Sequence, residues 1–246
     1  MSSLYETPRL LDEYLLFHYG GDEEIMPWPF GPVEALHFPV RTVSNFLDDT
    51  PRERALDLGC AVGRSAFELS RNCGQVVGVD YSRNFIAAAE AIRVLGRLEY
   101  TCREEASCTR PLTATLPAGI RPERVSFEQG DAMQLRNDLG DFDLVHAANL
   151  LCRLADPALL LSRLPSLVRP GGLLILTTPC TWLEEFTPPG RWPSGTTFEW
   201  LQAALLPHFT LQRKRDLPFV IREHARKFQW SVALGTAWIR KVPSES

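Results

Sequence analysis

Residues 55–64 read ALDLGCAVGR, a short apolar run that carries one acid and then enters a turn of small residues. Gly59, Ala61 and Gly63 let the backbone approach a ligand closely, because none of them carries a bulky side chain. A dinucleotide dehydrogenase prefers G-x-G-x-x-G at such a turn, and Ala61 departs from that pattern. Asp57 ahead of the glycines favours the looser turn that holds an adenosyl group without a pyrophosphate. Taken alone, the stretch also fits a tight strand-to-helix turn that binds nothing.

The next apolar run supports a nucleoside ligand. It reads VVGVD and ends in Asp80, about twenty residues beyond the first glycine of the turn. An acid at this spacing accepts hydrogen bonds from ribose hydroxyls. Tyr81 follows as a candidate to pack on the ribose or adenine, and Ser82 can cap the next helix at the same time.

Further motifs along the chain complete the pattern. The tetrapeptide QGDA places Asp131 and the backbone amide of Ala132 where an adenine amino group can be read. The stretch 141–149 reads as a strand that brings Asn149 to the carboxyl edge of a sheet, where ligands of open α/β sheets bind. Residues 169–173, RPGGL, stop a helix and begin another strand.

Short apolar runs alternate with helical stretches from residue 54 onward, which predicts βαβ units and a parallel sheet. Strands are expected at 54–58, 75–80, 124–129, 142–147 and 172–178, with a closing pair at 209–221 and 229–242. Helices are expected at 8–19, 33–48, 63–71, 82–96, 157–168 and 197–206. Residues 1–50 are interpreted as a cap or substrate segment, and residues 51–246 as the α/β core of a single compact domain. The polar stretch 98–122 is too long for an ordinary connection and predicts an inserted surface flap.

The composition excludes several classes of function. The net charge is −4 and the 26 basic residues form no long run, so we expect no nucleic-acid partner. No apolar stretch reaches the length of a membrane span, and the N-terminus lacks the apolar core of a signal peptide, which predicts a cytoplasmic protein without a membrane partner. The six cysteines form no C-x-x-C pair, so we expect neither a metal site nor a disulfide framework.

Taken in order, these motifs resemble the class I S-adenosylmethionine-dependent methyltransferase superfamily over residues 54–180. The resemblance implies an α/β, Rossmann-like, seven-stranded sheet that is mostly parallel, with an antiparallel last strand and an N-terminal helical cap. It also implies S-adenosyl-L-methionine as cofactor and S-adenosyl-L-homocysteine as product. The cofactor-binding residues are then Asp57, Gly59, Cys60, Ala61, Gly63, Asp80, Tyr81, Asp131, Ala132 and Asn149.

A closer resemblance covers almost the whole chain. Residues 5–20, 38–41, 148–154, 181–187 and 221–230 look like the 4-mercaptohistidine methyltransferase family of ovothiol biosynthesis. In that family the domain is often fused behind an iron-dependent sulfoxide synthase, whereas this chain resembles the free-standing form. The resemblance implies functional coupling to a separate sulfoxide synthase and a lyase that supply the substrate.

The implied reaction is methylation of the ring nitrogen of 5-thiohistidine nearest its side chain. A neutral imidazole is already nucleophilic, so the main task of the enzyme is alignment, and geometry must keep the thiolate away from the methyl group. Tyr14, Tyr19 and Asn149 are expected to fix the plane of the ring, although packing is an equal alternative for Tyr14. His18 is a weaker candidate for substrate contact, because a lone histidine beside apolar residues usually belongs to a core.

The carboxylate of an amino-acid substrate predicts an arginine partner. Arg41, Arg153 and Arg222 are the candidates. Arg222 and His224 are expected in the turn between the last two strands, at the rim of the site, with a solvated basic hairpin as the alternative. Glu184 is expected either to hold the amino group or accept a ring proton, or to lie at the surface.

Three other readings remain open from the sequence alone. The runner-up among enzymes is a class I methyltransferase for another small acceptor, since the core motifs identify the cofactor and not the substrate. A non-catalytic adenosyl-binding module is a second alternative, and a dehydrogenase, which Ala61 disfavours, is a third.

Overall fold

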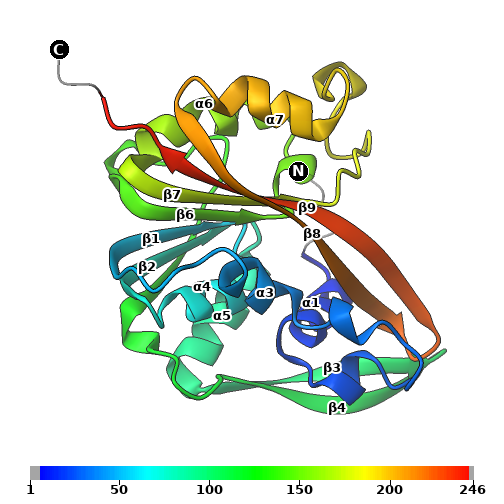
Figure 1. Ribbon diagram of the computed structural model, residues 1–246. Helices are drawn as coiled ribbons and strands as arrows, with labels where there is room; N and C mark the ends of the chain where they lie inside the picture. Colours follow the sequence, from blue (N-terminus) through cyan, green and yellow to red (C-terminus); the bar gives the residue numbers. More distant parts are fainter. Residues whose placement is uncertain (1–5, 244–246) are drawn as a thin grey trace.

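The computed structural model describes residues 6–243 and contains the sheet that the sequence predicts (Figure 1). Seven strands lie in the order β5-β2-β1-β6-β7-β9-β8. They are β1 (Arg52–Leu58), β2 (Cys73–Asp80), β5 (Val125–Gln129), β6 (Phe142–Ala148), β7 (Val168–Thr178), β8 (Phe209–His224) and β9 (Lys227–Arg240). The first five run parallel to one another, and β9 is antiparallel to both of its neighbours, β7 and β8. The predicted fold class is therefore confirmed. Residues 1–5 of the predicted segment 1–50, and residues 244–246 of the predicted core 51–246, lie outside the described residues.

Helices cover both faces of this sheet (Figure 1). On one face lie α1 (Pro8–Tyr19), α2 (Asp22–Ile25), α3 (Phe38–Ser44), α4 (Arg64–Leu69) and α5 (Arg83–Leu95). On the other face lie α6 (Pro157–Leu167) and α7 (Thr197–Leu205). The short 3-10 helices are η2 (Val33–Ala35), η3 (Pro122–Arg124), η4 (Asn137–Leu139), η5 (Leu151–Arg153) and η6 (Pro189–Arg191).

Side-chain alternation along the strands divides the interior into two cores. On β1, Leu56 and Leu58 are fully buried beneath α6 and α7, while Ala55 faces the helices α3 to α5. Asp57 points to the same side as Ala55, so this acid lies in the half of the molecule that holds the N-terminal helices. The alternation therefore decides which helices surround the polar groups of β1.

The predicted helix over residues 33–48 is wrong in its extent. The chain forms η2, then passes through His37 with a left-handed φ of 53°, and then begins α3. Pro39 sits in the first turn of α3, where its missing N–H costs nothing and its fixed φ suits a helix start. The proline thus starts a second helix where the apolar spacing alone suggests a continuous one.

The segment 98–122, for which the sequence predicts an inserted surface flap, contains regular secondary structure. It forms a second, two-stranded antiparallel sheet of β3 (Arg97–Glu105) and β4 (Cys108–Thr115). Tyr100, Cys102 and Ala114 from this hairpin are buried in the core that also contains α1. The hairpin therefore extends the wall beneath the N-terminal helices.

Strands β8 and β9 continue well past the rest of the sheet and curve toward the β3–β4 hairpin (Figure 1). At their tip the amide of Ala225 donates to the carbonyl of Glu104 at 3.0 Å, and Trp28 Nε1 donates to the carbonyl of Ala225 at 2.7 Å. The turn that joins the strands lies beyond Arg222 and His224, which are both strand residues. The prediction that they belong to the turn is therefore wrong.

No helix in the described part of the chain has both the length and the apolar character that a membrane span requires.

Candidate active site

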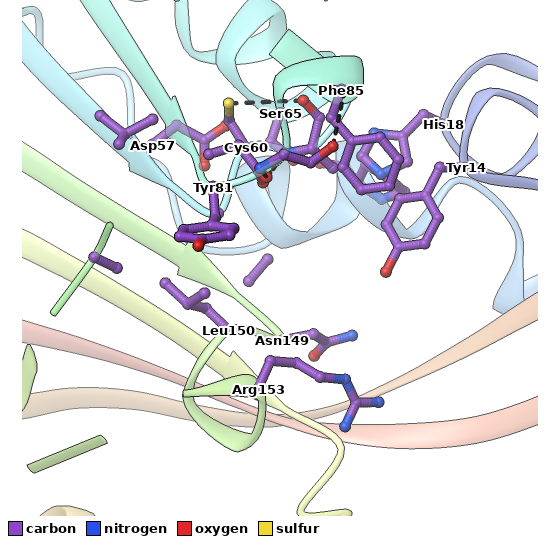
Figure 2. Close-up of a pocket in the computed structure, with 18 of the residues that line it drawn as sticks. Tyr14, His18, Asp57, Cys60, Ser65, Tyr81, Phe85, Asn149, Leu150 and Arg153 are labelled. Atoms are coloured by element: carbon purple, nitrogen blue, oxygen red, sulfur yellow. Dashed lines mark hydrogen bonds between the residues drawn. The ribbon is translucent and has the colours of Figure 1, made fainter. Parts of the chain in front are cut away.

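A cavity opens at the carboxyl ends of the parallel strands, where the topology predicts a ligand site. Its walls come from α1, α3, the β1–α4 turn, the end of β2, the η5 region and β8. Among its lining residues are Tyr14, Phe17, His18, Phe38, Pro39, Asp57, Gly59, Cys60, Ala61, Asp80, Tyr81, Ala132, Asn149, Arg153, Phe186, Phe219 and Ile221. Many of the residues named from the sequence thus share one cavity, and Figure 2 shows their arrangement.

The β1–α4 turn supplies a wall made of backbone. Gly59 has a φ of 69°, and a Cβ atom at this position would lie 3.0 Å from Leu150 Cδ1. Its amide donates to the carbonyl of Val79 at 2.8 Å, which ties the turn to the end of β2. Ala61 also has a positive φ of 47°. Gly59 therefore suits this position both in backbone conformation and in the room available, whereas Ala61 holds a positive φ in spite of its Cβ atom.

Asp80 closes the other side of this wall. Its Oδ2 accepts from the amide of Ala61 at 2.9 Å, and its Oδ1 accepts from the amide of Ser82 at 2.9 Å. Loss of solvent around the carboxyl raises the pKa of Asp80 to about 6, and the two amide hydrogen bonds oppose that rise. The carboxyl is thus fixed in place by the backbone, with acceptor capacity left over for a ligand that donates hydrogen bonds.

Asp57 lines the same cavity and is 1% exposed. Its Oδ1 lies 2.7 Å from His146 Nδ1. Its Oδ2 has no hydrogen-bond partner among the described residues. A buried carboxylate oxygen without a partner is costly, which points to a donor that arrives with the ligand.

Asn149 lies at the end of β6 in a left-handed conformation with a φ of 54°. Its backbone N–H donates to the carbonyl of Thr177 at 2.8 Å, and its side-chain Oδ1 accepts from Thr177 Oγ1 at 3.1 Å. The side-chain oxygen is therefore occupied, and the NH₂ group is the part left to act as donor toward the cavity. A strained conformation of this kind persists where surrounding contacts hold it, often at functional sites.

Arg153 and Tyr14 approach Asn149 at one end of the cavity (Figure 2). The guanidinium of Arg153 stacks over Phe186 at 4.7 Å, and among the described residues no acidic side chain forms an ion pair with it. Tyr14 packs on Phe85 with ring centroids 4.6 Å apart. This end therefore combines aromatic faces with an arginine that can receive an anion.

His18 on α1 packs beside the rings of Tyr14 and Phe17 and lines the cavity with them. Burial, helped by the nearby charge of Arg64, lowers the pKa of His18 to about 3. Its Nδ1 is buried without a hydrogen-bond partner among the described residues. The imidazole is therefore neutral at ordinary pH, which suits a hydrogen-bonding contact with a ligand and excludes a role as a cationic acid.

Other predicted residues lie outside the cavity lining. Gly63 begins α4, Asp131 Oδ1 accepts from the amide of Met133, Tyr19 donates to the carbonyl of Val62, and Glu184 is exposed. Arg41 donates to the carbonyls of Leu36 and Pro218, Arg222 pairs with Glu104, and His224 Nδ1 accepts from the amide of Arg226.

Three of these residues lie outside the cavity lining, so the lining gives no support for a direct substrate contact by them. Arg41 donates to two backbone carbonyls, and the terminal nitrogens of Arg222 bond the carbonyl of Glu24 and the carboxylate of Glu104, so both side chains join segments far apart in sequence. Glu184 lies on the solvent side of the segment after β7. Arg153 is the one of the three candidate arginines that lines the cavity.

The sequence reasoning missed the apolar part of the site. Phe38, Phe219 and Ile221 line the cavity but carry no chemical signature, and they meet only because β8 extends past the sheet. The ring centroids of Phe38 and Phe219 lie 4.8 Å apart. The aromatic residues that recur between positions 14 and 38 are the one signal in the sequence that could have indicated this wall.

Comparisons with known proteins agree with this geometry. The family model described as methyltransferase domain matches residues 34–228. A trans-aconitate 2-methyltransferase of Deinococcus radiodurans is 29% identical over 148 residues, covering 59% of this chain and 45% of that protein. A tRNA U34 carboxymethyltransferase of Idiomarina loihiensis is 27% identical over 167 residues, covering 63% and 45%. The chain thus spans less than half the length of these curated relatives.

Solved structures match over a larger share of the fold. The N-methyltransferase NodS of Bradyrhizobium japonicum WM9, in complex with S-adenosyl-L-homocysteine, superposes with a TM-score of 0.56. The match covers 94% of this chain and 98% of that one at 16% identity, so it shows the fold alone. With the fold, the cavity at the strand ends and a family model that matches most of its length, the chain belongs to the methyltransferase-domain family.

Proposed function

We propose that the chain transfers a methyl group from S-adenosyl-L-methionine to the ring nitrogen of 5-thiohistidine nearest the side chain, the last step of ovothiol biosynthesis. S-adenosyl-L-methionine is the cofactor, as the family and the fold indicate. The thiohistidine acceptor is the finer part of the proposal. It rests on the sequence resemblance and on the chemistry of one end of the cavity.

The residues present fit the cofactor. Asp80 offers a fixed carboxyl for the ribose hydroxyls, and the unpaired Oδ2 of Asp57 suits the ammonium group of the amino-acid part. The glycine turn supplies backbone where a side chain would obstruct the ligand. When bound, the cofactor supplies an electrophilic methyl group on its sulfonium sulfur.

Arg153 is the main observation in support of an amino-acid acceptor. This guanidinium lines the cavity without an acidic partner among the described residues, beside the free amide group of Asn149. A carboxylate is the natural occupant of such a pair of donors. The wall of Tyr14, Phe38 and Phe219 suits a flat aromatic ring. A small aromatic amino acid satisfies both requirements.

Alignment is the contribution that these residues make. A neutral imidazole nitrogen attacks without prior activation, so no strong base is needed, and its ring proton leaves to solvent after transfer. Holding the nitrogen in line with the methyl group can remove roughly 7–11 kcal/mol of the barrier. The aromatic wall would also fix the ring plane so that the thiolate points away from the methyl group.

The test is mass spectrometry of purified protein incubated with S-adenosyl-L-methionine and one acceptor at a time. We expect a mass increase of one methyl group on 5-thiohistidine, with none on histidine or on a simple thiol. The position of the methyl group is read from the fragment ions. Methylation of the thiol, or of no acceptor in the set, would contradict the proposal.

A pair of variants tests the acceptor end. Arg153→Met should raise KM for 5-thiohistidine by roughly tenfold or more, because a charge-assisted contact with the carboxylate is lost. The affinity for S-adenosyl-L-homocysteine should stay unchanged. Arg191→Met is the matched control, since Arg191 pairs with Asp156 outside the cavity lining and its loss should leave KM unchanged.

A further inference from the structure

His146 is a fully buried histidine in the middle of the sheet, and the reaction proposed above gives it no role. It stands on β6 directly beside Asp57 on β1, since the two residues are register partners in neighbouring parallel strands. Its Nδ1 lies 2.7 Å from Asp57 Oδ1, and its Nε2 lies 3.1 Å from Thr42 Oγ1 on α3. A row of hydrogen-bonded side chains therefore connects Thr42 on α3, through His146, to Asp57 at the end of β1.

The contacts of the imidazole define which atom donates to Asp57. A carboxylate oxygen accepts, so the Nδ1–H of His146 is the donor toward Oδ1 of Asp57. Nε2 pairs with the hydroxyl of Thr42, which either accepts from it or donates to it, because the carbonyl of Pro39 also accepts from Ser65 Oγ. In both arrangements the two ring nitrogens have partners, and the ring is held against Oδ1 of Asp57.

We propose that His146 is a positioning residue for the cofactor. Its ring binds Oδ1 of Asp57 and thereby directs Oδ2, the oxygen without a protein partner, at the ammonium group of S-adenosyl-L-methionine. Thr42 holds the far side of the ring and so connects α3 to the cofactor. The inference rests on the cofactor half of the proposed function and is independent of the identity of the acceptor.

Packing energy alone does not explain such a pair. The side chains of His146 and Asp57 are 0% and 2% exposed, and burying such polar groups costs free energy unless every one of their polar atoms finds a partner. A pair of apolar residues of similar volume is often as stable or more so. The unpaired oxygen at the cavity wall gives the polar pair a purpose that apolar residues could not serve.

The experiment compares two ligands by isothermal titration calorimetry on the intact protein. S-adenosyl-L-homocysteine carries the amino-acid part, whereas 5′-methylthioadenosine has the same nucleoside without it. Two variants separate the two hydrogen bonds of the ring. Asparagine places its amide nitrogen near the position of Nδ1, and glutamine places its amide nitrogen near that of Nε2.

We expect His146→Gln to weaken S-adenosyl-L-homocysteine by about tenfold or more, the loss that follows when a charged hydrogen bond is removed. His146→Asn should stay within about threefold of the wild-type affinity, because it can still donate to Asp57. Both variants should bind 5′-methylthioadenosine as the wild type does. In an Asp57→Asn background, His146→Gln should cause little further loss, as expected for two residues that act together.

Equal weakening of both ligands by His146→Gln would mean that the ring merely packs the sheet, and would overturn the proposal. Unchanged affinity for S-adenosyl-L-homocysteine would overturn it as well. A wild-type protein that binds neither ligand would remove the cofactor assignment and this inference with it. Failure of 5-thiohistidine as an acceptor would leave the binding result intact, so the two failures are distinguishable.

Discussion

Folding takes most of the water away from the carboxyl of Asp80 and returns two backbone hydrogen bonds. The result is a pKa of about 6, above the usual value for an aspartate. Below that pH the cofactor-free protein holds a neutral acid, which is a poorer acceptor for ribose hydroxyls than a carboxylate. If Asp80 binds the ribose as proposed, its ionisation sets the pH range in which the cofactor binds well.

We predict that S-adenosyl-L-homocysteine binds more tightly as the pH rises through about 6 and that the affinity levels off above it. The loss between pH 7.5 and pH 5 should be about tenfold, because one pKa unit corresponds to roughly 1.4 kcal/mol. Asp80→Asn should remove the pH dependence and weaken binding by about 1–3 kcal/mol. Calorimetric titrations across this range measure both effects, and a pH-dependent Asp80→Asn variant would assign the titration to another group.

His18 titrates in the opposite sense. Its pKa of about 3 in the folded chain lies below the value near 6.5 in the unfolded chain. Between those values the unfolded state binds a proton that the folded state does not, so stability falls as the pH falls. We predict a loss of up to about 1.4 kcal/mol per pH unit below 6.5, relative to a His18→Phe variant that cannot titrate. Urea unfolding at pH 7 and pH 5 gives the difference, and parallel curves would contradict the burial of a neutral imidazole.

The residues that the sequence placed correctly in the cavity follow short local patterns. Asp57, Gly59 and Asp80 are fixed by a strand, a turn and the next strand, so spacing along the chain is enough to bring them together. Arg222 could not be placed in this way. Its position depends on where the β8–β9 turn falls and on a partner, Glu104, that lies 118 residues away in the sequence.

At the scale of elements, the ion pair between Arg222 and Glu104 joins the β8–β9 hairpin to the β3–β4 hairpin. Arg222 on β8 is 2% exposed and donates to Glu104 Oε2 on β3 at 2.7 Å. The strands β8 and β9 were predictable from the sequence, whereas the segment that forms β3 and β4 was predicted as an inserted surface flap. The reason is that this hairpin becomes a stable sheet only when it packs against α1 and β8. Two-stranded hairpins are marginal alone, and tertiary contacts decide such segments.

We predict an asymmetry between the two members of this ion pair. Glu104→Ala should cost about 3–5 kcal/mol of unfolding free energy, because it leaves a buried guanidinium without its counter-charge. Arg222→Met should cost less, since Glu104 is partly exposed and can regain water. Neither change should raise KM for the acceptor as Arg153→Met does. Equal costs in urea unfolding would mean that burial of the arginine does not govern this contact.

At the scale of the whole molecule, the proposed mechanism, in which the protein only aligns the acceptor with the methyl group, requires no metal ion. The described residues hold no group of three histidine, cysteine, aspartate or glutamate side chains that could bind one. We predict that turnover persists in the presence of EDTA. Loss of activity in the chelator, restored by a single divalent metal, would contradict this prediction.

Hydrogen bonds connect the N-terminal helix α3 to α4 and to the buried histidine of β6. The carbonyl of Pro39 in α3 accepts from Thr42 and also from Ser65 of α4, each at 3.0 Å, and Thr42 contacts His146 behind the acid of the turn. We predict that S-adenosyl-L-homocysteine slows amide hydrogen exchange in α3 as well as around the glycine turn, because a ligand stabilises every segment whose opening would disrupt its site. Exchange in α7, on the opposite face of the sheet, should change little and serves as the internal control.

The same exchange measurement separates the two parts of the ligand. 5′-Methylthioadenosine fills the nucleoside site but brings no ammonium group to Asp57, so it should slow exchange at the turn while protecting α3 less. The difference should shrink in His146→Gln, because the link from Asp57 to Thr42 is then broken. Protection of α3 that is equal with both ligands would mean that the cap responds to the nucleoside alone, and that the path through the buried histidine carries no coupling.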